Sequence, residues 1–274
     1  MKWFNGFMAK KEKQAAQEQA GCSAEKTQST PRRSVVQVYF PQRELTLAYY
    51  NDRFDLHCGD KVYVEGKLEG KIGCVAEVSY SFRIHPGEYK KVIAVADTTV
   101  NGCFYMASSR CLTFDRNALP RKKVTAWLHA PAKEECLCGT DGATFRLEDF
   151  SGMSTDTGTM ERGREYYEEN RVRYLCLDGQ KGFALVEGSR VYEVEFEIAD
   201  GNVRNLTCSC YCTGNCKHTV AAMLELRAAL KKAKTQYPSQ FARTGYVASV
   251  TKWLLYLYAI SDKESGCMTL QIGD

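Results

Sequence analysis

The sequence predicts an α+β protein with two β-rich parts, and three features of the chain support this prediction. Short β-like runs separated by Gly or Pro fill residues 34–132, a texture typical of a small barrel or sandwich. Three further β-like runs lie between residues 172 and 201 and are separated by tight-turn residues, which describes an antiparallel meander. A cysteine-rich segment and an apolar, Ala-rich helical pattern follow the meander.

The net charge of +4 is concentrated at the start of the chain. Residues 1–33 hold seven basic and three acidic groups, whereas residues 34–150 hold 15 of each kind and residues 151–240 hold 12 of each. Because residues 1–33 also carry few apolar anchors, we expect a basic disordered tail there. The neutral body argues against a uniformly basic nucleic-acid coat and against a strongly acidic binding protein.

The chain carries 13 cysteines, and the compartment decides what they do. The apolar opening segment, residues 1–8, is too short for a secretory signal core. The longest apolar run, near residues 253–260, is under half the roughly 20 residues that a membrane-spanning helix needs. We therefore expect a cytoplasmic protein with reduced thiols, in which clustered cysteines indicate metal binding more often than disulfides.

A hairpin pattern lies within the first β-rich domain, residues 34–132. Alternating side chains over residues 59–66 run into a Gly-flanked turn, and a second alternating run returns over residues 70–75. This segment resembles the hairpin of SH3-like barrels of the KOW type. The resemblance implies a barrel that contacts nucleic acid or ribosomal partners.

Residues 133–158 are polar and rich in Gly, Asp, Ser and Thr, which indicates a linker. Cys136 and Cys138 lie in this linker with one residue between them, and His129 precedes them. A second metal site there would need a fourth donor that the sequence does not place nearby. Ordinary loop cysteines are therefore the favoured interpretation of this pair.

Four residues of metal-ligand type follow the meander within eleven positions: Cys208, Cys210, Cys216 and His218. Three thiolates and one imidazole are a donor set of closed, tetrahedral, structural zinc sites, so we expect one Zn²⁺. Residues two apart do not share a helix face. Cys216 should therefore precede the following helix, and His218 should lie in its first turn. Cys212 could compete with Cys210 as a ligand.

The helix after the cysteines is expected to place an apolar face on the meander and to carry a net charge of +4 between residues 216 and 234. The rest of residues 151–240 carries −4, so this part of the chain is neutral but polarised. The candidate nucleic-acid-binding residues are the cations of this helix: Lys217, Arg227, Lys231, Lys232 and Lys234.

Residues 159–236 form the predicted zinc domain, and about residues 159–232 resemble a SWIM-type zinc finger. A Tyr-rich helix with Tyr166 and Tyr167, an acidic strand, the Cys-x-Cys and Cys-x-His pairs and the Ala-rich helix carry the resemblance. Such modules occur beside bacterial Swi/Snf-type helicases and in transposases. The resemblance implies a DNA-binding or protein-interaction role. One departure is Tyr211, which stands where many relatives have proline.

Residues 237–274 predict a C-terminal β-hairpin extension. An apolar helix is the alternative, but the β-branched and aromatic content favours strands, and residues 262–266 have the composition of a turn. The apolar faces of such a hairpin would need cover from the zinc finger or from another chain.

These features favour a non-catalytic zinc-binding module that binds nucleic acid, with DNA preferred over RNA. The alternative is a protein-interaction adaptor that docks a partner, such as a separately encoded helicase, through an acidic strand face formed by Glu193, Glu195 and Glu197. No phosphate-cradling loop, carboxylate pair or nucleophile–base set is evident, so we expect no enzyme, no small-molecule substrate and no membrane partner.

Overall fold

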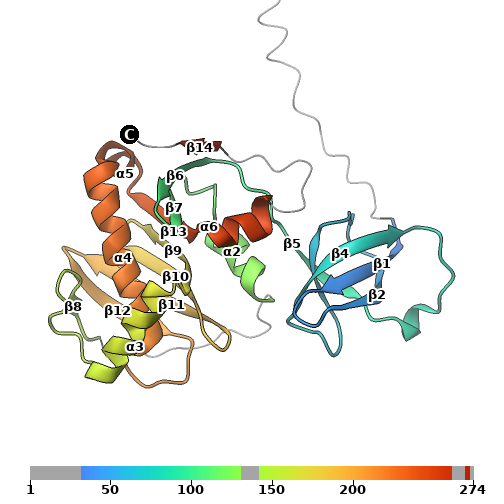
Figure 1. Ribbon diagram of the computed structural model, residues 1–274, viewed down its shortest axis with the longest axis horizontal. Helices are drawn as coiled ribbons and strands as arrows, with labels where there is room; N and C mark the ends of the chain where they lie inside the picture. Colours follow the sequence, from blue (N-terminus) through green and yellow to red (C-terminus); the bar gives the residue numbers. More distant parts are fainter. Residues whose placement is uncertain (1–31, 131–141, 261–268, 272–274) are drawn as a thin grey trace, which may run out of the picture.

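The computed structural model describes residues 32–130, 142–260 and 269–271, and its strands form two separate sheets (Figure 1). One sheet has five strands in the order β2-β1-β4-β3-β5, and the other has nine in the order β14-β6-β7-β13-β9-β10-β11-β12-β8. Helices and strands are both present and the pairing is antiparallel except between β14 and β6. The predicted α+β class is confirmed. Nearly all of the predicted basic tail lies outside the described residues.

The first sheet contains the hairpin that the sequence predicts. Its strands are β1 (Ser34–Phe40), β2 (Leu45–Asn51), β3 (Lys61–Val64), β4 (Ile72–Ser79) and β5 (Val92–Ala96). Strands β3 and β4 pair antiparallel, with Val62 opposite Gly73. A Cβ on Gly73 would lie 2.3 Å from Cγ1 of Val38, so only glycine fits this close approach. The sheet is not closed into a barrel, because its edge strands meet through a single bridge between Tyr50 and Lys91.

The second sheet contains the predicted meander and extends it on both sides. Its strands are β6 (Cys103–Ala107), β7 (Arg110–Thr113), β8 (Phe145–Arg146), β9 (Val172–Asp178), β10 (Lys181–Glu187), β11 (Val191–Ala199), β12 (Asn202–Cys208), β13 (Tyr246–Thr251) and β14 (Thr269–Gln271). Strands β9, β10 and β11 pair antiparallel in sequence order, and β12 continues the series. Along β11, Val194 and Phe196 are buried while Glu195 is exposed, as the alternation predicts.

Helices cover both faces of the nine-stranded sheet (Figure 1). The helices of this part of the chain are α2 (Arg121–Leu128), α3 (Thr157–Glu168), α4 (Lys217–Gln236), α5 (Pro238–Thr244), α6 (Lys252–Leu255) and a π-helical turn η2 (Tyr256–Ile260). The short helix η1 (Pro86–Glu88) lies between β4 and β5 of the five-stranded sheet. Leu175 and Leu177 of β9 pack in the core cluster beneath α4, whereas Tyr174 and Cys176 pack in the cluster with α2 and α6. Successive residues of one strand therefore serve two cores. Among the described residues, no helix is long and apolar enough to cross a membrane.

The nine-stranded sheet unites segments that the sequence predicts as separate parts. Strands β6 and β7 come from residues 34–132, β8 comes from the predicted linker, and β13 comes from the predicted C-terminal extension. The two-residue strand β8 pairs with β12 at the sheet edge. The nine-stranded sheet therefore extends across the predicted boundaries at residues 132, 158 and 236.

The predicted C-terminal hairpin is wrong. Strand β13 lies between β7 and β9 and pairs with both, and all six of its residues are buried. Its apolar content reflects a central strand covered on both faces. After β13 the chain enters α6, where the Thr251 side chain accepts a hydrogen bond from the Leu254 backbone N–H. Strand β14 pairs with β6 instead, and residues 262–266 lie outside the described residues.

A buried ion pair fixes α4 to the sheet. Nε of Arg110, on β7, lies 2.7 Å from Oε1 of Glu225, near the middle of α4. The hydroxyl of Ser249, on β13, donates to the same carboxylate over 2.7 Å. Desolvation raises the pKa of Glu225 and lowers that of Arg110, while each partner's charge opposes the shift of the other. Because a lone charge at this depth would be costly, the pair disfavours any sliding of α4 along the sheet.

Helix α3 packs closely on α4 at a glycine. A Cβ on Gly163 would lie 2.4 Å from both Cβ and Cγ1 of Val220. Val220 is β-branched and fully buried, so it has no flexible end that could move away. The spacing of the two helices therefore depends on the absence of a side chain at position 163.

We expect Gly163→Ala to lower the free energy of unfolding by about 1–3 kcal/mol, because the added methyl group must separate α3 from α4. The matched control is Gly158→Ala in the first turn of the same helix, where a Cβ would lie 3.3 Å from Arg162 and Asp156 side-chain atoms. This control should keep or slightly raise the stability. Urea denaturation of both variants measures the difference, and equal stabilities would contradict the close contact.

Candidate metal centre

The four predicted metal ligands come together where β12 ends and α4 begins. Cys208 is the last residue of β12, Cys210 lies in the turn that follows, and Cys216 is the N-cap of α4. His218 lies in the first turn of that helix, as the sequence predicts. The ligand atoms of all four residues lie within 4.8 Å of one another.

The distances within this cluster fit one ion at its centre. The Cys210 and Cys216 sulfurs are 3.5 Å apart, and His218 Nδ1 lies 3.6 Å from the Cys216 sulfur and 3.8 Å from the Cys208 sulfur. A tetrahedron with bonds of about 2.3 Å to sulfur has edges of about 3.8 Å. Three thiols and one imidazole are also soft donors that suit zinc. The cluster is compatible with a single zinc site.

The start of α4 favours a thiolate at Cys216. The backbone N–H of Cys216 donates to Oγ1 of Thr219 over 2.9 Å, and the Cys216 sulfur in turn accepts from the Thr219 backbone N–H. A hydrogen bond from the Cys208 thiol lowers the pKa of Cys216, and His218 and the Thr219 N–H lower it further. The pKa of Cys208 is raised, since its proton is held by Cys216. Negative charge therefore gathers at the positive end of the helix dipole.

Aromatic packing holds the His218 ring in place. The ring stacks on Tyr192 with centroids 4.1 Å apart and meets the edge of Tyr166 at 5.6 Å. Its Nε2 is buried and has no hydrogen-bond partner among the described residues. A Cβ on Gly188 would lie 3.3 Å from this nitrogen and 3.0 Å from the Tyr192 ring. A side chain at position 188 would therefore have to displace the Tyr192 and His218 rings slightly.

The other candidate ligands lie outside this cluster. Cys212 is exposed and does not belong to the four-residue group that the described residues form. Cys136 and Cys138 lie outside the described residues. His129 contacts Glu193 instead, with Nε2 3.1 Å from the carboxylate, and this hydrogen bond raises the pKa of His129.

The cations predicted to bind nucleic acid do not form one surface. Lys217 lies beside the zinc cluster, where its ammonium is 4.6 Å from the centre of the Tyr166 ring. Lys232 lines a cavity of about 260 Å³ that also contains Glu225. Arg227, Lys231 and Lys234 line a larger groove together.

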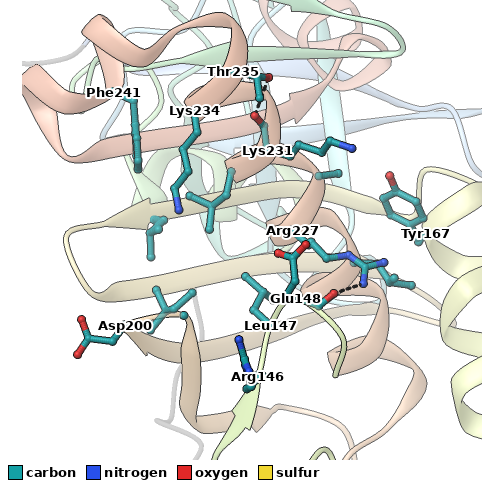
Figure 2. Close-up of a pocket in the computed structure, with 16 residues that line it drawn as sticks. Arg146, Leu147, Glu148, Tyr167, Asp200, Arg227, Lys231, Lys234, Thr235 and Phe241 are labelled. Atoms are coloured by element: carbon teal, nitrogen blue, oxygen red, sulfur yellow. Dashed lines mark hydrogen bonds between the residues drawn. The ribbon is translucent and has the colours of Figure 1, made fainter. Parts of the chain in front are cut away.

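This larger groove, of about 1030 Å³, runs beside α4 and is drawn in Figure 2. Arg146 of β8 adds a fourth cation, whereas Glu148 and Asp200 supply two carboxylates. The Lys234 side chain points from α4 into the groove. Arg227 donates to the backbone carbonyl of Glu148 over 2.8 Å. The contributions of Arg146 and Glu148 carry no sequence signal, because both lie in the predicted linker.

We expect purified protein to contain one zinc ion per chain and to lose stability when a chelator removes it. Zinc binding contributes about 10–16 kcal/mol in zinc-finger peptides, so metal loss should unfold the start of α4. Cys216→Ser should lower the melting temperature and the zinc content together. Cys212→Ser, which changes an exposed neighbour, should leave both unchanged. A metal-free protein with an unaltered melting curve would contradict a structural ion.

The comparisons with known proteins leave the family open. No protein-family model matches this chain, and no solved structure matches it. An uncharacterized protein of Methanocaldococcus jannaschii is 38% identical over 69 residues, which is 25% of this chain and 29% of that protein. The chain thus matches less than a third of that relative. The structural finding at this site is a Cys/His cluster compatible with zinc.

Proposed function

We propose that this protein is a non-catalytic, zinc-stabilised module of SWIM type that binds nucleic acid, with DNA as the preferred form. The observation that carries the proposal is the groove beside α4, which collects Arg146, Arg227, Lys231 and Lys234 against Glu148 and Asp200. A groove with excess positive charge attracts phosphates, and phosphate contacts dominate nucleic-acid affinity.

The side chains of the groove suit a phosphate backbone. Lys231 and Lys234 are exposed and lie one turn apart on α4. Arg227 is held by the Glu148 carbonyl and lies 4.7 Å from the centre of the Phe150 ring, so its position is fixed before any ligand arrives. The affinity should be modest because four cations make few phosphate contacts, and it should fall as salt rises because each contact releases a counterion.

The closed donor set supports a structural role for Zn²⁺. Cys208, Cys210, Cys216 and His218 would fill all four positions of a tetrahedral ion and leave none for a catalytic water. The ion would then act by fixing β12 against the first turn of α4. The SWIM assignment rests on this donor set together with the order of α3, the acidic strand β11 and α4.

The adaptor alternative has weaker support because the acidic face of β11 has partners within the chain. Glu193 and Glu195 both contact Arg121 of α2, and Glu197 lies 3.0 Å from Arg204 of β12. These exposed pairs reduce the charge that a basic partner would meet. The groove is the better-supported binding surface.

We expect Lys231→Glu/Lys234→Glu to weaken binding to a DNA duplex by about tenfold at low salt, since two phosphate contacts become repulsive. The matched control is Arg83→Glu/Lys122→Glu, which makes the same charge change at exposed positions outside the groove lining. Fluorescence anisotropy at about 50 and 200 mM salt measures both affinities and their salt dependence. An unmodified protein that binds no DNA or RNA at low salt would overturn the function.

A further inference from the structure

A second cavity, of about 580 Å³, lies between the five-stranded sheet and the nine-stranded sheet. Its lining includes the β3–β4 hairpin with Lys61 and Lys71, the β10–β11 turn with Arg190, and the C-terminal helical segment with Trp253 and Tyr258. The β1–β2 turn and the end of α2 complete the lining. Nearby, the Tyr63 hydroxyl of β3 donates to the Ala126 carbonyl of α2 over 3.0 Å and so connects the five-stranded sheet to this helix. We call this cavity the inter-sheet cleft.

The cleft carries an excess of positive charge. Lys61, Lys71 and Arg190 line it, and none of these three forms an ion pair with another described residue. The carboxylate in the lining, Glu187, forms an ion pair with Arg173. The unpaired charges at the cleft are therefore cations, which attract a polyanion.

Exposed aromatic rings lie in the cleft and beside Arg190. Trp253 lines the cleft with 51% of its surface exposed, and the Arg173 guanidinium lies 4.7 Å from the centre of its ring. Tyr211 is 94% exposed in the loop between Cys208 and Cys216, which we call the zinc knuckle of the proposed module. The Arg190 guanidinium lies 5.4 Å from the Tyr211 ring and its NH2 group donates to the Ser209 carbonyl over 2.9 Å. Arg190 thus connects the cleft to the knuckle.

From these contacts we propose that the inter-sheet cleft and Tyr211 bind single-stranded nucleic acid, with Trp253 and Tyr211 as stacking platforms for unpaired bases. Proteins that hold single strands combine a cationic path with exposed aromatic rings, on which bases of any sequence stack. A duplex keeps its bases stacked inside the helix, so it can satisfy the cations but not the rings. The inference rests on the proposed nucleic-acid function and adds that this second surface prefers single strands to duplexes.

The β3–β4 hairpin supplies two of the cations that line the cleft. Lys71 is exposed and follows Gly70, whose φ of +79° lies in the left-handed region that favours glycine. Lys71 lies at the end of this turn, Lys61 lies at the start of β3, and both line the cleft between the two sheets. The segment that resembles a KOW hairpin therefore contributes cations to the cleft.

The test uses the full-length, zinc-loaded protein and three labelled probes. These are an oligothymidine of roughly 16 nucleotides, an oligouridine of the same length, and the DNA duplex that contains the oligothymidine. Trp253→Phe, Trp253→Ala and Tyr211→Ala are compared by fluorescence anisotropy at low salt. We expect each alanine variant to lose about tenfold in affinity for a single strand and to keep its duplex affinity. Trp253→Phe, which retains a ring, should keep most of the single-strand affinity.

The matched control is Tyr256→Ala, which removes a ring that is 62% exposed three residues from Trp253 but does not line the cleft. It should leave all affinities unchanged. Single strands should also quench the tryptophan fluorescence of the unmodified protein and quench that of Trp253→Phe less, since this variant lacks the indole ring that lines the cleft. Preference for DNA or RNA in the two oligonucleotide arms identifies the natural strand.

The outcomes separate this inference from the proposed function. If the unmodified protein binds the duplex but both alanine variants bind single strands as tightly as it does, the cleft does not hold bases and the inference is overturned. The groove function then still stands. If the unmodified protein binds no nucleic acid at low salt, the function fails and the inference fails with it.

Discussion

The seating of α4 on the nine-stranded sheet is the constraint on which both candidate surfaces depend. The first turn of the helix supplies Cys216 and His218 to the metal cluster, its middle is fixed by the buried pair of Glu225 with Arg110, and its last turns line the groove. Val220 against Gly163 sets its distance from α3. A helix of 20 residues is about 30 Å long. One rigid element thus holds the zinc knuckle and the groove at a fixed separation.

The distribution of charge, and not the net charge, distinguishes the acidic strand β11 from the cationic groove beside α4. The acidic residues of β11 face α2 and β12, where Arg121, His129 and Arg204 engage them. The cations on the last turns of α4 have only Glu148 and Asp200 nearby in the groove. They also lie at the negative pole of the helix dipole, which stabilises them. A chain that is neutral over residues 151–240 therefore presents a cationic groove.

The sequence predicts what is local and misses what is long-range. The four cluster residues lie within eleven positions, and the turns with Gly179 and Gly201 at positive φ delimit the strands of the meander, so spacing alone sufficed for both. The pairing of β13 with β7 joins residues more than a hundred positions apart, and no local pattern encodes it. The apolar composition of β13 is compatible with a central strand as well as with a hairpin strand, and the structure buries all six residues. The placement of Arg146 in the groove depends on the short pairing of β8 with β12, which composition does not show.

The two proposed surfaces, the inter-sheet cleft with Tyr211 and the groove beside α4, would depend on the metal to different degrees. Tyr211 lies between Cys210 and Cys212 in the loop that the metal would close, so its position relative to Arg190 depends on the ion. Three of the groove cations lie on α4 after Glu225, whose pair with Arg110 anchors the helix without any metal, and the fourth, Arg146, lies on β8. Folding energy from zinc would therefore stabilise the single-strand surface directly and the groove only through the helix. Tyr211 is 94% exposed, and an ion bound by its neighbour Cys210 would fix the orientation of the loop that carries this ring.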